Sequence, residues 1–163
     1  MAVVVGTDVY ISVADADTYW LARGNAAWAA ASDAAKEAAL LEATQYLDGA
    51  YTYIGDQITT QVLAWPRYDA QVTQGNFKNI FYDSDTIPPQ IETACAELAL
   101  EGLDASLQPA EARGGAIKKE KVDVIEVEYM DWAPSGKTYG FVTNILKPLL
   151  INQNKHTRKV IRT

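Results

Sequence analysis

Residues 32–51, SDAAKEAALLEATQYLDGAY, decide the fold of this chain. Leu40, Thr44, Leu47 and Tyr51 recur at spacings of four, three and four on an alanine-rich background. This period and this composition are typical of a helix with one buried face. The sequence therefore predicts a mainly α protein organised around this helix.

Two further helices are predicted on either side of it. Ser12 and Asp15 form a capping pair for a short helix over residues 13–23, which Gly24-Asn25 stops. Pro88-Pro89 begins a third helix that runs to about Asp104. Its buried face is expected to contain Ile91, Ala94, Cys95, Leu98 and Leu103.

Residues 52–87 form a long segment without sustained periodicity. Its aromatic residues favour a packed, ordered loop over a disordered one. Trp65 precedes Pro66 and must be extended, because proline disfavours a helical residue before it. We predict that Trp65, Pro66 and Arg67 anchor the loop to the helical bundle, with Trp65 buried and Arg67 as its polar neighbour.

A β-hairpin is predicted after Gly114-Gly115. Over residues 116–130 apolar residues alternate with Glu126 and Glu128, and the alternation slips near Asp123. A turn at Asp123-Val124 places Lys121 opposite Glu126 and Lys119 opposite Glu128, so both pairs attract. A short helix is predicted over residues 138–147.

The domain organisation follows from these elements. The predicted domain covers residues 1–150, with a helical bundle over 12–104, the hairpin over 116–130 and the short helix over 138–147. Residues 151–163 form an extended C-terminal arm. The predicted fold class is therefore a small, mainly α bundle with a long ordered loop, a β-hairpin and that arm.

Composition narrows the class of protein. At 163 residues and 48% hydrophobic content, the chain can form one domain that buries roughly 70% of its unfolded surface. No stretch approaches the ~20 apolar residues of a membrane span, and residues 1–5 are a short apolar run without the basic leader of a signal peptide. We expect one soluble domain made in a cytoplasm. The single cysteine, Cys95, excludes an internal disulfide.

Charge is divided unevenly along the chain. Residues 1–110 contain fifteen acids and four bases, whereas residues 111–163 contain six acids and ten bases. The two parts carry −11 and +4, which sum to the net charge of −7. A basic end on an acidic body is suited to docking on a partner. We predict that the arm makes this contact through Lys155, His156, Arg158, Lys159, Val160, Ile161 and Arg162.

Catalytic motifs are incomplete. Gly136-Lys137-Thr138 resembles the end of a phosphate-binding loop, but Asp131 stands where that motif requires glycine. His156 is the only histidine and lacks partners for a zinc site or a triad. No cofactor and no metal site is predicted, and we expect a protein that is not an enzyme.

Two acidic pairs allow other interpretations. Asp83 and Asp85 could share a cation, although an Asp-x-Asp in a polar loop is more often a turn and capping pair. Glu97 and Glu101 lie four residues apart on a predicted helix, which indicates a solvated face.

A series of short stretches carries a family resemblance. In order they are 10–17 (YISVADAD) with Tyr19, 28–33 (WAAASD), 36–40 (KEAAL), 43–48 (ATQYLD), 63–67 (LAWPR), 87–88 (IP), 94–100 (ACAELAL), 114–115 (GG), 119–122 (KEKV) and 125–129 (IEVEY). Over residues 10–150 they resemble a family of small tailed-phage proteins labelled DnaT-like and single-stranded-DNA-binding. The sequence departs from the family pattern in the loop 69–85 and at Asp123-Val124.

The resemblance implies a structural role as a head-to-tail adaptor, or connector, of a tailed bacteriophage. Such a protein forms a ring, of twelve subunits, beneath the phage portal protein and joins it to the tail or to the next connector. The implied location is the neck of the virion, and the host cytoplasm during assembly. Genome DNA would pass through the channel without sequence-specific binding, and the arm would contact the portal.

Single-stranded-DNA binding is the alternative function. It requires aromatic rings on which bases stack, interleaved with Lys and Arg. Here the aromatic residues lie mostly in the acidic part of the sequence, and none follows Phe141. On that ground the sequence favours the connector role over DNA binding.

Overall fold

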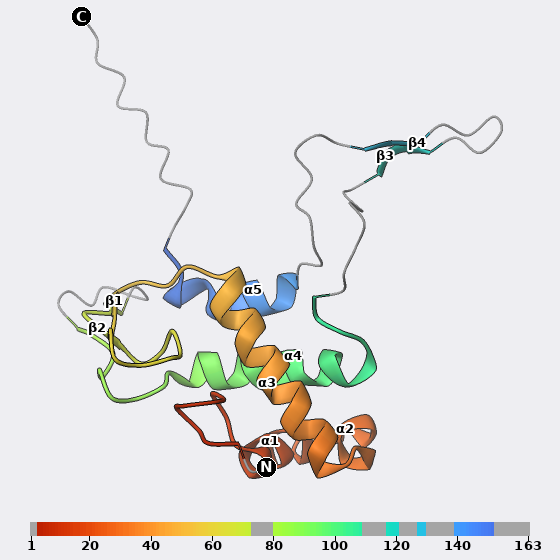
Figure 1. Ribbon diagram of the computed structural model, residues 1–163, viewed down its shortest axis with the longest axis horizontal. Helices are drawn as coiled ribbons and strands as arrows, with labels where there is room; N and C mark the ends of the chain where they lie inside the picture. The colour runs from red at the N-terminus through yellow and green to blue at the C-terminus, as the bar shows by residue number, and fades with distance from the viewer. Residues whose placement is uncertain (1–2, 73–79, 109–116, 121–126, 130–138, 152–163) are drawn as a thin grey trace, which may run out of the picture.

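The computed structural model describes residues 3–72, 80–108, 117–120, 127–129 and 139–151, with the backbone alone in the two segments between 117 and 129. Its elements, in chain order, are α1 (Val13–Leu21), α2 (Ala26–Ala30), α3 (Asp33–Ala50), β1 (Asp56–Gln57), β2 (Arg67–Tyr68), α4 (Pro89–Asp104), β3 (Ile117–Glu120), β4 (Val127–Tyr129), α5 (Gly140–Leu146) and the 3-10 helix η1 (Lys147–Leu149). Figure 1 shows α3 crossing α4, with α1 and α2 near one end of α3 and α5 near the other. The predicted mainly α class with a small antiparallel hairpin is confirmed.

Helices α3 and α4 form the centre of the core. Leu40 and Leu47 of α3 and Ile91 and Leu98 of α4 are all fully buried, as their spacing predicted. Gly102 of α4 comes close to α3, because a Cβ added there would lie 3.8 Å from the Cα of Ala39. This is an ordinary van der Waals distance, so the two helices are in close contact here and still leave room for a methyl group.

The short helix α2 was not predicted. Gly24-Asn25 stops α1 as expected, but Asn25 also caps a new helix, since its side chain accepts the N–H of Trp28 at 3.0 Å. Trp28 is buried against Trp20 of α1, with ring centroids 6.4 Å apart. One dipeptide therefore ends one helix and begins the next.

The long loop between α3 and α4 is ordered over its described residues. Strands β1 and β2 pair in antiparallel fashion, and Gln71 bridges to Phe81. The structure places Trp65 entirely inside the core, and the peptide bond from Trp65 to Pro66 is cis. Residues 73–79 of this loop lie outside the described part.

The C-terminal part adds a hairpin and a helix. Strands β3 and β4 are antiparallel, and Lys119 pairs with Glu128 as predicted. The predicted turn at Asp123-Val124 and the pairing of Lys121 with Glu126 lie outside the described residues. Helix α5 agrees with the predicted short helix and starts two residues later than expected.

Backbone hydrogen bonds fix the end of α5 and η1 to the chain that follows α3. The N–H of Ile54 donates to the carbonyl of Leu149 at 2.9 Å, and the N–H of Ile151 donates to the carbonyl of Thr52 at 3.0 Å. The division into a domain over 1–150 and an arm over 151–163 stays a prediction, because residues 152–163 lie outside the described part. None of the helices in the described part is long and apolar enough to cross a membrane.

Candidate functional site

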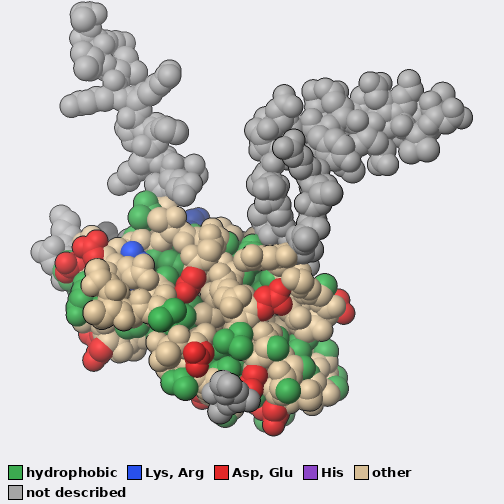
Figure 2. Space-filling view, viewed as in Figure 1, with side chains coloured by type: hydrophobic (Ala, Val, Ile, Leu, Met, Phe, Trp, Pro, Cys, Tyr) green, Lys and Arg blue, Asp and Glu red, His purple; other side chains and the backbone are tan. Residues whose placement is uncertain are grey.

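The body of the protein is strongly acidic. The described segments 3–72 and 80–108 contain fifteen acids and three bases, a formal charge of −12. On the face shown in Figure 2, acidic side chains are scattered over the body, while Lys and Arg surfaces are few and lie toward its upper edge. Such a surface repels a polyanion unless exposed cations offset it.

Lys36 is one of the three bases, and its charge is used internally. Its Nζ donates to Oδ1 of Asp17 at 2.8 Å, and the side chain is 8% exposed. The Nε1–H of Trp28 donates to the same oxygen at 2.7 Å. Desolvation works to raise the pKa of Asp17, but these two hydrogen bonds lower it below its usual value. Lys36 is therefore not available to an external anion.

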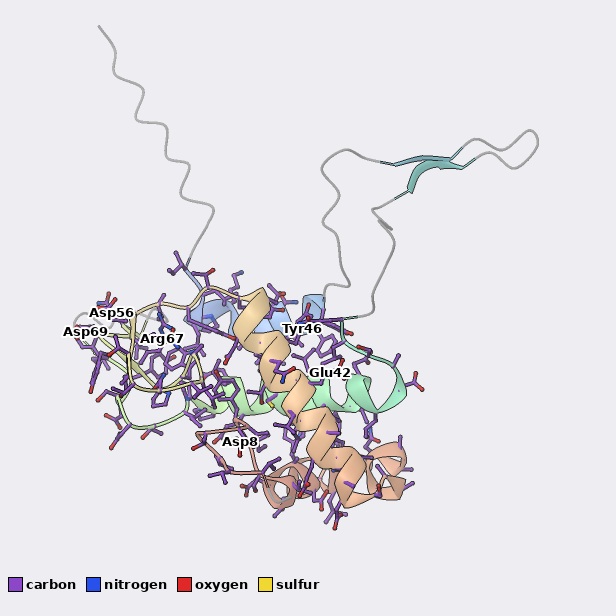
Figure 3. All side chains as sticks on the ribbon, viewed as in Figure 1. Asp8, Glu42, Tyr46, Asp56, Arg67 and Asp69 are labelled. Carbon is purple, nitrogen blue, oxygen red and sulfur yellow. The ribbon has the colours of Figure 1, made fainter. Side chains whose placement is uncertain are left out.

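The two arginines of the body are also engaged. Arg67 donates to the carbonyls of Ile54, Gly55 and Ala64 at 2.8, 2.7 and 3.2 Å. Figure 3 shows it within the long loop, at the end of the molecule where Asp56 and Asp69 also lie. These bonds hold the two sides of the loop together, so Arg67 acts as an internal strut.

Arg23 is used in a similar way at the end of α1. Its Nη1 donates to the carbonyl of Tyr19 at 3.1 Å, and its guanidinium carbon lies 3.4 Å from the centroid of the Tyr19 ring. The cation therefore stacks on a ring of α1, although the Arg23 side chain stays exposed to solvent.

A different surface is formed by α5 and η1. Val142, Leu146 and Leu149 point into the core. Phe141, Asn144 and Lys147 follow one another at spacings of three, so they lie together on the outer side of the helix. We call these three residues the α5–η1 surface.

The α5–η1 surface combines an aromatic ring with a cation. Phe141 is 41% exposed, and Lys147 is exposed. Residues 139–151 contain one base and no acid. Of the four Lys and Arg side chains that the structure describes, Lys147 alone has no internal partner.

A chain of aromatic rings connects the α5–η1 surface with the interior. From Phe141 the rings follow in the order Tyr139, Tyr46, Tyr51, Tyr53, Trp65 and Tyr82, with successive centroids 6.1, 5.3, 6.3, 6.5, 5.8 and 6.1 Å apart. The contacts are edge-to-face or tilted, which is the favourable geometry for aromatic pairs. The hydroxyls of Tyr51 and Thr143 also share a hydrogen bond of 3.0 Å. The surface is thus fixed on a rigid base.

The predicted site residues fall into two groups. Trp65, Pro66 and Arg67 meet in the loop, where Trp65 is buried and Arg67 is half-buried. The arm residues Lys155, His156, Arg158, Lys159, Val160, Ile161 and Arg162 lie outside the described part. Sequence reasoning did not select Phe141 or Lys147. The sequence pattern that could have identified them is the apolar stripe of Val142, Leu146 and Leu149. If that stripe packs on the core, Phe141 and Lys147 must lie on the exposed side of the helix.

The alternative sites can be compared with the described residues. No group of three His, Cys, Asp or Glu in the described part could hold a metal ion. Glu97 is half-buried and accepts the hydroxyl of Tyr19 at 2.6 Å, so the solvated face predicted for Glu97 and Glu101 is wrong at Glu97. His156 and Gly136-Lys137-Thr138 lie outside the described residues.

One comparison with known proteins gives a match. A family model described as "Putative DnaT-like ssDNA binding protein" matches residues 2–163, almost the whole chain. Neither the curated proteins nor the solved structures give a significant match.

This match overturns the connector role that the resemblance implied. Its description supports the binding of single-stranded DNA, which had been the alternative. The ring of twelve subunits, the portal and tail partners and the passage of DNA without binding were therefore wrong. The choice of the arm residues as a contact site stays a prediction. The location in the virion neck had been inferred only from the connector role, and no observation tests it.

The positions of the aromatic residues along the sequence do not exclude DNA binding, because burial decides which rings a ligand can reach. Trp20, Trp28 and Trp65 lie in the acidic part of the sequence but are buried, so they cannot stack on a base. Only exposed rings are accessible for stacking with bases. Among these, Phe141 lies on the same side of α5 and η1 as Lys147.

Proposed function

Because the chain belongs to the family of DnaT-like single-stranded-DNA-binding proteins, we propose that it binds single-stranded DNA. The α5–η1 surface is the proposed contact on the body, and the basic residues after Gly114 supply most of the charge. The observation that carries this assignment is that Lys36 is buried against Asp17 and Arg67 is held by carbonyls of the loop. Arg23 is exposed but stacks on Tyr19 beside the acidic α1. Lys147 is the described cation that has neither an internal partner nor an acid in its own segment, 139–151.

The distribution of charge along the chain supports binding of DNA through its C-terminal part. Residues 111–163 contain ten bases, and residues 152–163 contain four bases and no acid. Phosphate contacts supply much of the affinity of proteins for nucleic acid, through the release of counterions. The acidic segments 3–72 and 80–108 repel the strand, so binding through the basic residues that follow Leu150 is electrostatically favoured.

The exposed ring of Phe141 supports a preference for single strands. Bases of a single strand are free to stack on an aromatic side chain, whereas those of a duplex are already stacked on each other. Tyr68 and Phe81 are also about half exposed, but Asp56 and Asp69 flank Tyr68 in β1 and in the loop. Phe141 is the ring whose own segment, 139–151, carries no acid.

The proposed activity is binding alone, without catalysis. The incomplete phosphate-binding motif at Asp131 supports this part of the proposal. ATP turnover by the pure protein that disappears in Lys137→Ala would contradict it.

The direct test is fluorescence anisotropy with a labelled oligothymidine on the order of 20 nucleotides, longer than the usual site of one binding domain. We expect binding at low salt and weaker binding to a duplex of equal length. The logarithm of the affinity should fall linearly with the logarithm of the salt concentration, and the slope of that line is the salt slope. Deleting residues 152–163 should reduce the salt slope by up to about 3, because each phosphate contact with single strands contributes about 0.7. Lys147→Ala should reduce it by about 0.7.

Matched variants identify the stacking ring. Phe141→Leu keeps an apolar side chain but removes the ring, so affinity should fall about tenfold if one base stacks there. Phe81→Leu, at a ring of similar exposure, is the control and should bind as the wild type does. Absence of binding at low salt, or equal affinity for duplex and single strand, would refute the proposed function.

A further inference from the structure

A hollow of about 450 Å³ lies between α1, α2 and the first turn of α3. Leu21 of α1 lines it and is 82% exposed, and Ala26 and Ala29 of α2 line it and are exposed as well. The buried rings of Trp20 and Trp28 also contribute to its lining. Apolar walls around a few polar groups are typical of a site for a small organic group.

Two polar side chains meet in this hollow, Asp17 and Lys36. Nζ of Lys36 donates to Oδ1 of Asp17 at 2.8 Å, and Nε1 of Trp28 donates to the same oxygen. The second oxygen, Oδ2, accepts no hydrogen bond from the described residues, although the Asp17 side chain is 46% exposed. The hollow therefore contains an open acceptor.

Lys36 supplies donors at the same place. Its side chain is only 8% exposed, and one of the three N–H groups on Nζ donates to Asp17. No other group in the described part accepts a hydrogen bond from Nζ. A buried ammonium is stabilised by each further acceptor that it meets. An open acceptor and an unused donor thus lie side by side.

This pair selects for a neutral ligand. The carboxylate repels an anion and the ammonium repels a cation, and the two charges lie within hydrogen-bond distance of each other. The group that fits presents a donor next to an acceptor. Nucleobases have such an edge, for example the N3–H of thymine beside its O4, on a flat ring that apolar walls can accommodate.

We propose that the hollow binds one unpaired nucleobase of a single strand. For thymine, N3–H donates to Oδ2 of Asp17, O4 accepts from Nζ of Lys36, and the ring lies against Leu21 and Ala29. In a duplex this edge is already paired, so only a single strand can offer it. The choice of ligand rests on the proposed function. The hollow is a contact apart from the α5–η1 surface, since α1 and α2 lie near the other end of α3 (Figure 1).

Arg23 is placed to meet a phosphate of the same nucleotide. It precedes Gly24, which lines the hollow, and its side chain is exposed. Its Nη1 donates to the carbonyl of Tyr19, which leaves the rest of the guanidinium fork open among the described residues. Asp15 and Asp17 of α1 offset this cation, so the base supplies most of the affinity at this site.

Thymidine is the direct probe, because it carries the base without a phosphate. The indole N–H signals of isotope-labelled protein are followed by NMR as thymidine is added. The signal of Trp28, whose N–H donates to Asp17, should shift and saturate with a dissociation constant on the order of a millimolar. The signal of Trp65, which lines no part of the hollow, should stay in place. No shift at Trp28, or equal shifts at both rings, would overturn the proposal.

A modified nucleoside tests the hydrogen-bonding edge. N3-methylthymidine keeps the ring but lacks the N3–H, so it should bind about fivefold or more weakly than thymidine. Asp17→Asn keeps Oδ1 for Lys36 and Trp28 and replaces the open acceptor with a donor. The two nucleosides should then bind about equally. An unchanged preference for thymidine in Asp17→Asn would show that the carboxylate does not read the base, which overturns this assignment.

A matched pair of variants tests the hollow itself. Ala29→Leu fills it and should abolish the thymidine-induced shift of the Trp28 signal. Ala27→Leu is the control, since Ala27 is exposed on the same short helix and does not line this hollow. Loss of the shift in both variants, or in neither, would contradict binding between α1 and α2.

Salt separates this site from the proposed function. Thymidine carries no charge, so its binding should not change with salt, and deleting residues 152–163 should leave it intact. Ala29→Leu should lower the affinity for oligothymidine several-fold without changing the salt slope. A protein that binds oligothymidine but shows no thymidine shift at Trp28 refutes the base site alone. A thymidine shift without any binding of oligothymidine refutes the proposed function and, with it, the assignment of the base to a strand.

Discussion

The hydroxyl of Tyr10 donates a hydrogen bond to the carboxylate of Asp48, which lies 38 residues later in the chain. The N–H of Ala64 donates to both groups, at 3.0 and 3.2 Å, and the N–H of Trp65 donates to the same hydroxyl at 3.2 Å. One buried polar cluster thus joins the segment before α1, the end of α3 and the long loop. Burial raises the pKa of Asp48, and the hydrogen bonds from Tyr10 and Ala64 oppose that shift.

Tyr10→Phe should destabilise the fold by about 1–3 kcal/mol, because it leaves buried N–H and carboxylate groups without their partner. Urea unfolding at neutral pH measures this change. Tyr19→Phe is the control, since the hydroxyl of Tyr19 bonds only to the half-buried Glu97. If Tyr10→Phe is no more destabilising than Tyr19→Phe, the cluster does not hold the loop.

Stability should fall steeply above about pH 10, the usual pKa of tyrosine in an unfolded chain. Burial, with a smaller contribution from Asp48, raises the pKa of Tyr10 well above that value in the folded state. The unfolded state then releases a proton that the folded state keeps, so rising pH favours unfolding. Each such tyrosine adds about 1.4 kcal/mol per pH unit to the loss.

The same pH dependence distinguishes the tyrosines. Burial, with the hydrogen bond to Glu97, raises the pKa of Tyr19 to about 12, so its contribution ends near that pH. Tyr10→Phe should make the stability profile shallower throughout the alkaline range. Urea unfolding at a series of pH values above 9 measures the slope, and an unchanged slope in this variant would contradict the assignment.

Trp65→Ala should cost about 3 to 5 kcal/mol through the cavity it leaves. The ring is fully buried between the edges of Tyr53 and Tyr82. Val62→Ala, at a side chain that is 80% exposed three residues earlier, should change stability by less than about 0.5 kcal/mol. A decrease in melting temperature of only a degree or so for Trp65→Ala would show that the site collapses around the missing ring.

The same substitution should act in opposite directions at two glycines. Gly55 has φ of +74°, and an added Cβ would overlap the carbonyl oxygen of Tyr68, so Gly55→Ala should cost about 2 kcal/mol or more. Gly49 lies within α3 and has open space around it, so Gly49→Ala should stabilise by about 0.5–1 kcal/mol. Denaturant unfolding compares them. Similar effects of the two would mean that the contact of β1 with β2 is looser than described.

Local patterns accounted for most of the helices and little of the loop. The caps at Ser12 and Ser32 and the prolines before α4 are short-range signals, and each helix began where they predicted. The helix α2 was missed because its five residues are too few to show a period. The loop depends on contacts such as Tyr10 with Ala64, 54 residues apart, which no local pattern encodes.

The candidate site was predictable only in part. The uneven distribution of charge along the sequence indicated a basic end. What the sequence concealed was which cations remain accessible, since that depends on Lys36 meeting Asp17 across 19 residues and on Arg67 reaching the carbonyls of Ile54 and Gly55. Exposure of Phe141 likewise follows from the side of α5 that packs on the core.

The row of rings from Phe141 to Tyr82 has an optical consequence. Tyrosine emission overlaps tryptophan absorption, and every tyrosine in the row lies within a few ring contacts of Trp65. Light absorbed by these tyrosines is therefore collected at Trp65 by resonance energy transfer. The ratio of tyrosine to tryptophan emission therefore reports, without any attached dye, whether the rings of this row keep their contacts.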